Sequence, residues 1–296
     1  MKSFKNIFLR VVVLVVAALA LLVLAACGDG GFREITEAHP NAISVFTREG
    51  GSGTRSAFIE LTGIYDGGVD RTLNRATVAS GTGAITNAVA ENPFSIGYIS
   101  LGAMRDSVRA LPVDGVTPSV EAVINGTYPL FRNFYIAVPT KVSALTQDFI
   151  DFILSTQGQE IISGQGYVSP MQNPLAYTGS GMRGTIHVEG STSVAPVMRT
   201  LADAYMALHG AADVRVEVRS TGSGAGITAA REGSVDIGMS SRSIRRAERE
   251  ELRASIVMAY DGIAVIVHPT NGLSSVSVDE IRQIFMGEVA RWEDMK

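Results

Sequence analysis

Apolar and polar positions alternate along the chain with two periods, one typical of strands and one typical of helices. Short β-branched or apolar runs bounded by turn residues predict strands at 42–47, 76–80, 95–100, 130–138, 185–189, 214–218, 235–239, 256–260 and 263–267. Helices are predicted at 52–61, 83–90, 118–124, 145–162 (one or two helices), 225–231, 244–252 and 278–285. A further helix follows the strand at 185–189, because Val197, Leu201, Ala202 and Tyr205 recur at spacings of three and four. Alternation of strands with helices predicts an α/β fold.

The pattern is interrupted once, between Tyr167 and Gly184, where prolines and glycines replace the periodic residues. Such a segment is typical of a linker. A chain of 296 residues with 46% hydrophobic content can bury two cores. We therefore expect two lobes.

The N-terminal segment predicts export and lipid attachment. Its features are the positive residues Lys2, Lys5 and Arg10, an apolar run at 11–26, and Leu24-Ala25-Ala26-Cys27 at its end. This is the pattern of a lipoprotein signal over residues 1–27, followed by a polar tether at 28–37. A retained transmembrane anchor is the alternative, but the run falls short of the roughly 20 apolar residues that span a bilayer. Cys27 is the only cysteine, so an internal disulfide is excluded and lipid attachment is the role we predict for it.

The net charge of -4 comes from 29 acidic and 25 basic residues, without a long run of like charge. A nucleic-acid partner is therefore not expected. If the ligand is an anion, a local site must capture it, since the overall field would weakly repel it.

Three short loops share one design, in which a strand runs into a Gly/Ser/Thr turn that opens a helix. They are Arg48-Glu49-Gly50-Gly51-Ser52-Gly53-Thr54, Gly190-Ser191-Thr192-Ser193, and Ser220-Thr221-Gly222-Ser223-Gly224-Ala225-Gly226. The first N–H groups of a helix lack internal partners, and glycine lets a ligand come close to them. One such loop is more often a plain cap and turn. Three of them indicate a convergent oxyanion site.

Arg48 has two interpretations that the sequence leaves open. It can give a charge-assisted contact to a bound anion, or form an ion pair with Glu49 or another carboxylate. The sequence gives little support for a nucleotide-binding, metal-binding or catalytic site. The first loop has no P-loop lysine, no metal-ligating cluster has suitable spacing, and no nucleophile elbow is present. We therefore expect no metal, no cofactor and no enzymatic activity.

With these loops in place, the sequence resembles the phosphate-binding proteins of bacterial phosphate ABC transporters. The stretches that carry the resemblance are the three loops, Gly190–Pro196, Val235–Arg242, Ile284–Gly287 with Trp292, Ser95–Tyr98 and the strand from Tyr128 to Tyr135. The resemblance covers nearly all of the chain after the signal. It implies a two-lobed, type II periplasmic-binding-protein-like fold that closes about a hinge.

The order of these stretches differs from that family's usual order, so the resemblance implies a circularly permuted chain. Segment 171–184 would join the family's old ends, and a fragment of a tandem array is the alternative. Permutation is tolerated when the ends lie close together at the surface. By resemblance, one lobe would comprise 38–127 plus 268–296, and the other 128–267.

Matching residue by residue, the resemblance implies an anion site shared by both lobes. One lobe would contribute Arg48, Ser52, Gly53 and Thr54, and the other would contribute Thr192, Ser193, Ser223 and Ser241. Ser241 departs from the family's best-described members, which carry a carboxylate there, so preference for phosphate over sulfate is less secure. Asp236 is expected to cap or turn its strand.

The function implied is capture of inorganic phosphate in an inter-lobe cleft and delivery to an ABC transporter permease. The protein would be a monomer outside the cytoplasm, held to the cell membrane by its N-terminal lipid. The alternatives are binding or sensing of another, sulfate-like oxyanion, or a non-transport role as a surface scaffold.

Overall fold

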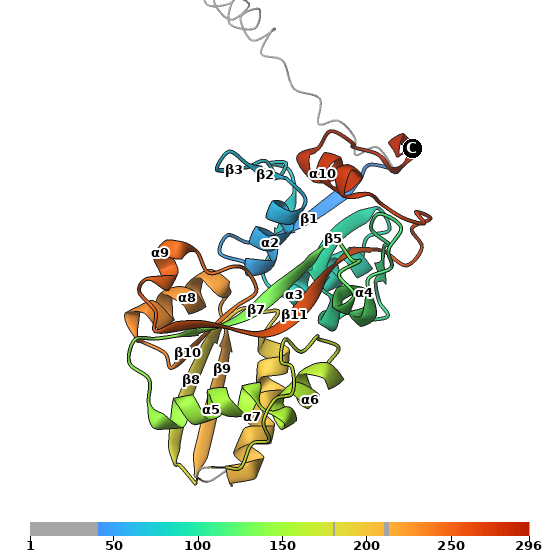
Figure 1. The fold of residues 1–296 in the computed structure, drawn as a ribbon. Helices are drawn as coiled ribbons and strands as arrows, with labels where there is room; N and C mark the ends of the chain where they lie inside the picture. The colour runs from blue at the N-terminus through green and yellow to red at the C-terminus, as the bar shows by residue number, and fades with distance from the viewer. Residues whose placement is uncertain (1–40, 180, 210–212, 296) are drawn as a thin grey trace, which may run out of the picture. The chain divides into compact units, whose positions relative to one another are not determined.

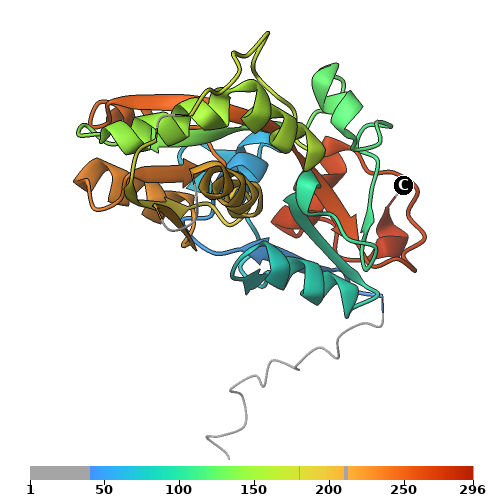
Figure 2. The same ribbon diagram turned by 90° about the horizontal axis from the view of Figure 1, so that it is seen from below.

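The computed structural model describes residues 41–179, 181–209 and 213–295. They form an α/β fold, as the alternating pattern predicts (Figures 1 and 2). The predicted signal at 1–27, Cys27 and the tether at 28–37 lie outside the described residues. Within the described part of the chain, no helix is both long enough and apolar enough to cross a bilayer.

The strands are β1 (Ser44–Arg48), β2 (Tyr65–Asp66), β3 (Val69–Asp70), β4 (Thr77–Ala79), β5 (Ser95–Ser100), β6 (Arg109–Ala110), β7 (Phe131–Val138), β8 (Gly184–Gly190), β9 (Val214–Ser220), β10 (Ile237–Ser240) and β11 (Ala254–Val267). The α-helices are α2 (Gly53–Leu61), α3 (Thr82–Ala90), α4 (Val120–Ile124), α5 (Ala144–Leu154), α6 (Thr156–Gly164), α7 (Ala195–His209), α8 (Ser223–Glu232), α9 (Arg246–Arg249) and α10 (Val278–Met286). Two 3₁₀ turns lie at Leu101–Ala103 and Trp292–Asp294.

Strand order in the main sheet is β4-β1-β5-β11-β7-β10-β8-β9, with β6 pairing β11. Strand β1 runs parallel to β4 and β5, and β8 runs parallel to β9 and β10. The long strand β11 pairs antiparallel with both β5 and β7, and β7 pairs antiparallel with β10. Two parallel blocks are therefore joined through β7 and β11.

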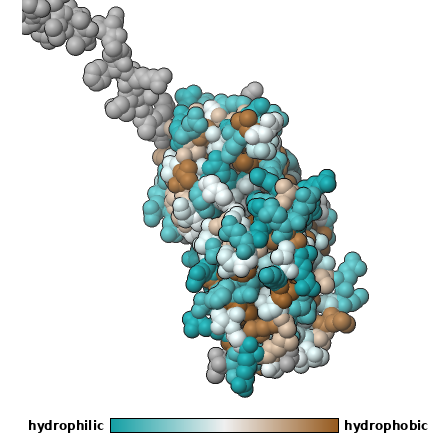
Figure 3. Space-filling view, turned by 90° about the vertical axis from the view of Figure 1, so that its left-hand side faces the viewer, coloured by the Kyte–Doolittle hydropathy of each residue, from teal (hydrophilic) through white to brown (hydrophobic). Residues whose placement is uncertain are grey.

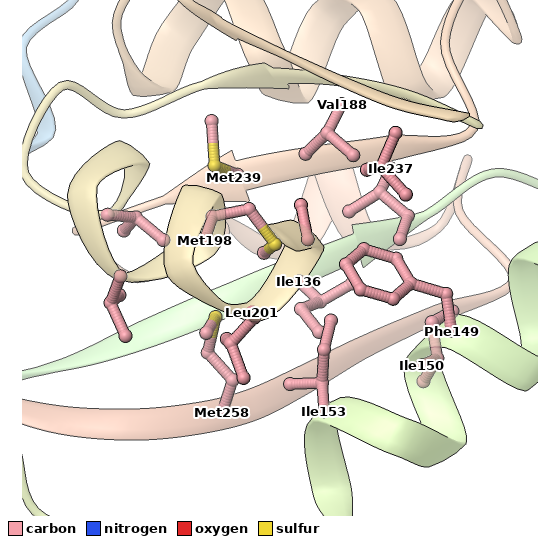
Figure 4. Close-up of a cluster of buried hydrophobic side chains, with 14 of the residues drawn as sticks. Ile136, Phe149, Ile150, Ile153, Val188, Met198, Leu201, Ile237, Met239 and Met258 are labelled. Atoms are coloured by element: carbon pink, nitrogen blue, oxygen red, sulfur yellow. The ribbon is translucent and has the colours of Figure 1, made fainter. Parts of the chain in front are cut away.

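Each parallel block has its own large hydrophobic core. We call β1, β4 and β5 with α2, α3, α4 and α10 the β1 lobe, and β8, β9 and β10 with α5, α6, α7 and α8 the β8 lobe. In the β1 lobe, Phe58 stacks on Tyr98 with ring centroids 3.9 Å apart, and Phe285 packs against both rings. In the β8 lobe, α5 and α7 bury Phe149 and Leu201 against the sheet (Figure 4).

The prediction of two strands at 256–260 and 263–267 is wrong, because β11 runs unbroken from Ala254 to Val267. Asp261 and Gly262, which separate the two predicted strands, lie in register with Arg132 and Phe131 of β7. The Asp261 carboxylate is paired with Arg132, so the strand tolerates a charge in its buried middle.

The helix predicted at 244–252 is also wrong in extent, since α9 covers only Arg246–Arg249. The chain leaves the helix so that Arg253 N–H can donate to the Val138 carbonyl and begin the pairing of β11 with β7. Helix α4 begins at Val120 with Ser119 as N-cap, so Pro118 precedes the helix rather than occupying its first turn. The β2–β3 hairpin and β6 are short elements without a sequence prediction.

Candidate functional site

Four turns place the candidate residues. Strands β1, β4, β8 and β9 each lead within a few residues into a helix, namely α2, α3, α7 and α8. Because β1 is parallel to β4, and β8 is parallel to β9, each pair of turns emerges at the same edge of its block. Hydrogen bonds between the turns show that the two pairs meet. Gly224 N–H, in the first turn of α8, donates to the Gly51 carbonyl, in the turn after β1, at 3.0 Å.

Arg48, at the end of β1, is the cation at this meeting point, and its side chain is 1% exposed. Its Nε and Nη2 donate to the Glu49 carboxylate at 2.8 and 2.7 Å, and Nη2 also donates to Thr192 Oγ1 at 3.0 Å. Its Nη1 is buried and has no hydrogen-bond partner within the described residues. The ion-pair interpretation is therefore confirmed, while the contact to a bound anion stays a prediction for which one donor group remains unused.

Partial burial alone would raise the pKa of Glu49, but the hydrogen bonds and the charge of Arg48 outweigh it and lower the pKa. Gly81 N–H adds a further hydrogen bond to this carboxylate at 3.2 Å. Glu49 is thus held as an anion that compensates Arg48 on one side. The charges of Arg48 and Glu49 balance each other. The guanidinium of Arg55 also lies close, because its Nη1 donates to the Arg48 carbonyl at 2.7 Å, and its charge is paired with Asp70.

The predicted hydroxyl residues lie together across the two lobes. Thr54 Oγ1 and Ser193 Oγ are 2.8 Å apart, and Ser223 Oγ and Ser241 Oγ are 3.3 Å apart. All four side chains are buried. Ser52 is the N-cap of α2, and its hydroxyl accepts a hydrogen bond from Arg55 N–H at 3.2 Å. The structure therefore brings these residues, with Arg48 and Thr192, into one cluster, which we call the hydroxyl cluster.

Glycine shapes this cluster at two kinds of position. Gly81 and Gly222 precede α3 and α8 with φ of +88° and +98°, a conformation that disfavours side chains. Gly53 opens α2, and a Cβ there would lie 2.2 Å from Ser223 Oγ and 2.7 Å from Ser241 Oγ. Only glycine allows the α2 N-terminus to approach the opposite lobe this closely.

Three residues around the cluster were not among the predicted site residues, although Ser191 lies in one of the three loops. Thr82, the first residue of α3, has Oγ1 3.3 Å from Thr192 Oγ1 and 3.4 Å from Ser193 Oγ. A signal for it exists, because Ser80-Gly81-Thr82-Gly83 repeats the strand, glycine and hydroxyl design of the three loops. Ser191 donates to Ser241 Oγ at 2.9 Å, and Arg132 Nη1 donates to the Ser241 carbonyl at 3.3 Å.

Asp236 does not belong to the hydroxyl cluster. Its carboxylate accepts from His187 N–H at 2.8 Å, which anchors the start of β10 to β8 as the strand-capping interpretation predicts. Within the described residues, no group of three or more His, Cys, Asp or Glu side chains could hold a metal ion. The cluster thus consists of neutral donors around one buried cation at the N-termini of four helices. Such an arrangement suits an anion.

Comparison with known proteins gives consistent similarities. The model of a PBP superfamily domain matches residues 37–157 and again residues 175–296. "Phosphate-binding protein PstS 2" of Streptococcus pneumoniae is 39% identical over 289 residues, covering 93% of this chain and 98% of that protein. "Phosphate-binding protein PstS" of Bacillus subtilis is 30% identical over 114 residues, covering 38% of this chain and 37% of that protein.

A solved structure agrees with these similarities. The crystal structure of a phosphate-binding protein of a phosphate ABC transporter from Streptococcus pneumoniae superposes with a TM-score of 0.71 at 41% sequence identity. The superposition covers 86% of this chain and all of that one.

Proposed function

This chain belongs to the PstS phosphate-binding proteins of the PBP superfamily, and from this premise we propose that it is the phosphate receptor of an ABC transporter. It would capture inorganic phosphate between its lobes outside the cytoplasm and deliver it to the permease. The full-length relative and the superposed structure both carry phosphate binding in their names. We assign the protein no enzymatic role, because binding and release complete this task.

The observation that carries the proposal is the unused donor of Arg48. A buried guanidinium nitrogen without a partner is costly, and a phosphate oxygen would satisfy it with a charge-assisted hydrogen bond. Glu49 holds the other edge of the guanidinium and so fixes its orientation. Glu49 therefore fixes the position of the Arg48 guanidinium and leaves its Nη1 free to donate.

The remaining ligands that we propose surround this cation. Gly53 with the hydroxyls of Ser52 and Thr54 would bind from the β1 lobe, while Thr192, Ser193, Ser223 and Ser241 would bind from the β8 lobe. Thr82 joins the proposed set, because it touches two of these hydroxyls. The N-termini of α2, α3, α7 and α8 add backbone N–H donors and favourable dipoles at no cost in net charge.

Ligand capture would be coupled to closure about β7 and β11, the strands that join the lobes. The lobe boundaries that we propose are 38–127 plus 268–296 for one lobe and 128–267 for the other. Hydrogen bonds such as Arg48 to Thr192 link the two sides directly. An anion held by both sides would favour the closed arrangement, which the permease could recognise.

We also propose that the chain is circularly permuted relative to other members of the family, with 171–184 joining the former ends. Support comes from the partial alignment with the Bacillus subtilis protein, which covers 38% of this chain. When two proteins contain the same two parts in opposite order, a continuous alignment between them can include only one of these parts. The Streptococcus pneumoniae protein aligns along nearly its whole length, so it would share the exchanged order.

Export, lipid attachment at Cys27 and membrane tethering complete the proposal, on the grounds of the signal at 1–27. The protein would act as a monomer. On the face drawn in Figure 3, hydrophobic residues are scattered among hydrophilic ones, which fits a surface that faces water. Mass spectrometry of the protein extracted from membranes would show a diacyl mass on the fragment beginning at Cys27. A mature chain that begins elsewhere would contradict the anchor.

Calorimetric titration tests the central proposal. The purified full-length chain in detergent, dialysed free of carried-over ligand, should bind phosphate at one site. Arg48→Met should weaken this binding by about 2–5 kcal/mol, because one buried charged donor is lost. Arg291→Met, at an exposed ion pair with Asp294, is the matched control and should bind like the wild type. A folded chain that binds no phosphate would overturn the proposed function.

A further inference from the structure

The direction of the hydrogen bonds in the hydroxyl cluster leads to an inference about the class of anion. A hydroxyl has one proton and two lone pairs, so a bond received from a fixed donor leaves the proton free to be given elsewhere. Arg48 donates to Thr192 Oγ1, Arg55 N–H donates to Ser52 Oγ, and Ser241 N–H donates to Ser223 Oγ. An N–H group cannot accept in return. These three hydroxyls are therefore set to donate.

Ser241 receives its hydrogen bond from another hydroxyl, that of Ser191, at 2.9 Å. Ser191 Oγ itself accepts from the N–H groups of Ser193 and Val194, at 3.2 and 3.3 Å. Both of its lone pairs are thereby engaged, so its proton can only be donated. Ser191 thus fixes the direction of the bond to Ser241, and Ser241 also keeps a proton to give. Its neighbour Ser223 Oγ, at 3.3 Å, continues the same chain.

No carboxylate among the described residues accepts a hydrogen bond within this chain of hydroxyls. Glu49 accepts its hydrogen bonds from Arg48 and from Gly81 N–H instead. A carboxylate in the chain would require a proton on the ligand and would repel a fully ionised one. A row of donors places no such requirement.

We infer that the site accepts tetrahedral oxyanions as a class, whether or not they carry a proton, so that sulfate is a true competitor of phosphate, and that Ser191 is a positioning residue for this choice. The inference rests on the proposed function and sharpens it. Sulfate offers four acceptor oxygens and no proton, which suits the donors. Hydrogen phosphate carries one proton, which must be donated to a hydroxyl oxygen with a free lone pair, such as that of Ser241.

Competition calorimetry on the full-length chain tests the inference. For the wild type, we expect the sulfate and phosphate dissociation constants to lie within about 100-fold of each other. Ser241→Asp should raise the sulfate-to-phosphate ratio of dissociation constants at least about tenfold, because it introduces an acceptor and a like charge. Ser191→Ala frees a lone pair of Ser241, so it should move the ratio in the same direction.

Ser95→Ala provides the matched control. Ser95 is likewise a buried serine, and its hydroxyl donates to the Val89 and Asn92 carbonyls away from the cluster. The Ser95→Ala variant should leave the ratio of the two dissociation constants unchanged. If Ser191→Ala acted only on the structure, it would weaken the binding of both anions equally, and the ratio would again be unchanged. Phosphate binding that a 1,000-fold excess of sulfate does not disturb would overturn the inference about anion class and leave the proposed function standing. Binding of neither anion would overturn the proposed function itself.

Discussion

The hydroxyl of Thr54 lies 2.8 Å from the hydroxyl of Ser193, although the two residues are 139 positions apart. Thr54 lies in the first turn of α2 and Ser193 in the turn before α7, so the contact joins the two lobes. Both residues are 1% exposed. A hydrogen bond between two helix N-termini brings their positive ends together, which is favourable only when a negative charge compensates them.

Thr54→Val should therefore affect binding more than folding. Valine keeps the shape and removes the hydroxyl, so we expect the binding free energy for phosphate to weaken by about 1.5–3 kcal/mol, the contribution of one hydrogen bond to a charged group. Thr62→Val, at a buried threonine at the C-terminal end of the same helix, is the control and should retain affinity. Titration calorimetry measures both variants, and equal affinities would place Thr54 outside the site.

Gly53→Ala tests the close approach of the lobes. The added Cβ would lie 2.2 Å from Ser223 Oγ, so the two sides of the hydroxyl cluster could not meet as they do. We expect phosphate affinity to fall at least about tenfold, which is 1.4 kcal/mol. Gly83→Ala is the matched control, because Gly83 lies in the first turn of α3 with no atom within 4 Å of its added Cβ. Wild-type affinity of Gly53→Ala would contradict the importance of this approach.

Several elements could be predicted from the sequence because local patterns decide them. Strand β5 has the predicted bounds, since its six residues are all buried and lie between turn residues. The three glycine-rich loops could be recognised because helix N-termini have local requirements for hydroxyls and glycine. Their convergence was predicted from the design that they share, and contacts such as Arg48 to Thr192 confirm that loops of the two lobes meet.

The features that could not be predicted from the sequence depend on contacts between residues far apart in the chain. Asp261-Gly262 reads as a turn signal, and only its partner Arg132, 129 residues away, makes an unbroken strand acceptable. The role of Ser191 depends on which groups donate to its hydroxyl, and the sequence carries no information on hydrogen-bond direction. Thr82 is different, because its loop has the same design as the other three and could have been included.

Glu49 predicts a dependence of stability on pH. Its pKa in the folded protein is lowered from 4.5, because the hydrogen bonds and charge of Arg48 outweigh the effect of burial. A lowered carboxyl pKa means that the stabilisation is fully present above pH 4.5 and is lost as the pH falls through the lowered value. The difference in unfolding free energy between wild type and Glu49→Gln should be constant above pH 4.5 and should shrink below it.

Urea denaturation at a series of pH values measures this difference. Glu293→Gln, at an exposed pair with Arg291, serves as the control for removal of a surface carboxylate. A difference that grows as the pH falls would show that Glu49 is not held as an anion by Arg48.

The ion pair between Arg132 and Asp261 is the last test, because it lies on the two strands that join the lobes. Arg132 Nη2 and Asp261 Oδ2 are 2.9 Å apart, with side chains 3% and 0% exposed. Ser100 Oγ also donates to Asp261, and Arg132 Nη1 donates to the Ser241 carbonyl. Asp261→Asn leaves a buried guanidinium uncompensated, so we expect a loss of about 3–5 kcal/mol in unfolding free energy.

The double variant Arg132→Met with Asp261→Leu removes both charges and should be far closer to the wild type in stability than Asp261→Asn, since apolar residues of similar size can replace a buried pair. Arg246→Met, at the exposed pair with Glu250, should change stability by less than about 0.5 kcal/mol and is the control. Denaturation in urea gives these values, and titration with phosphate gives a second result. Because the double variant also removes the contact to the Ser241 carbonyl, we expect it to fold but to bind phosphate more weakly. Wild-type affinity in a stable double variant would show that Arg132 serves the joining strands alone.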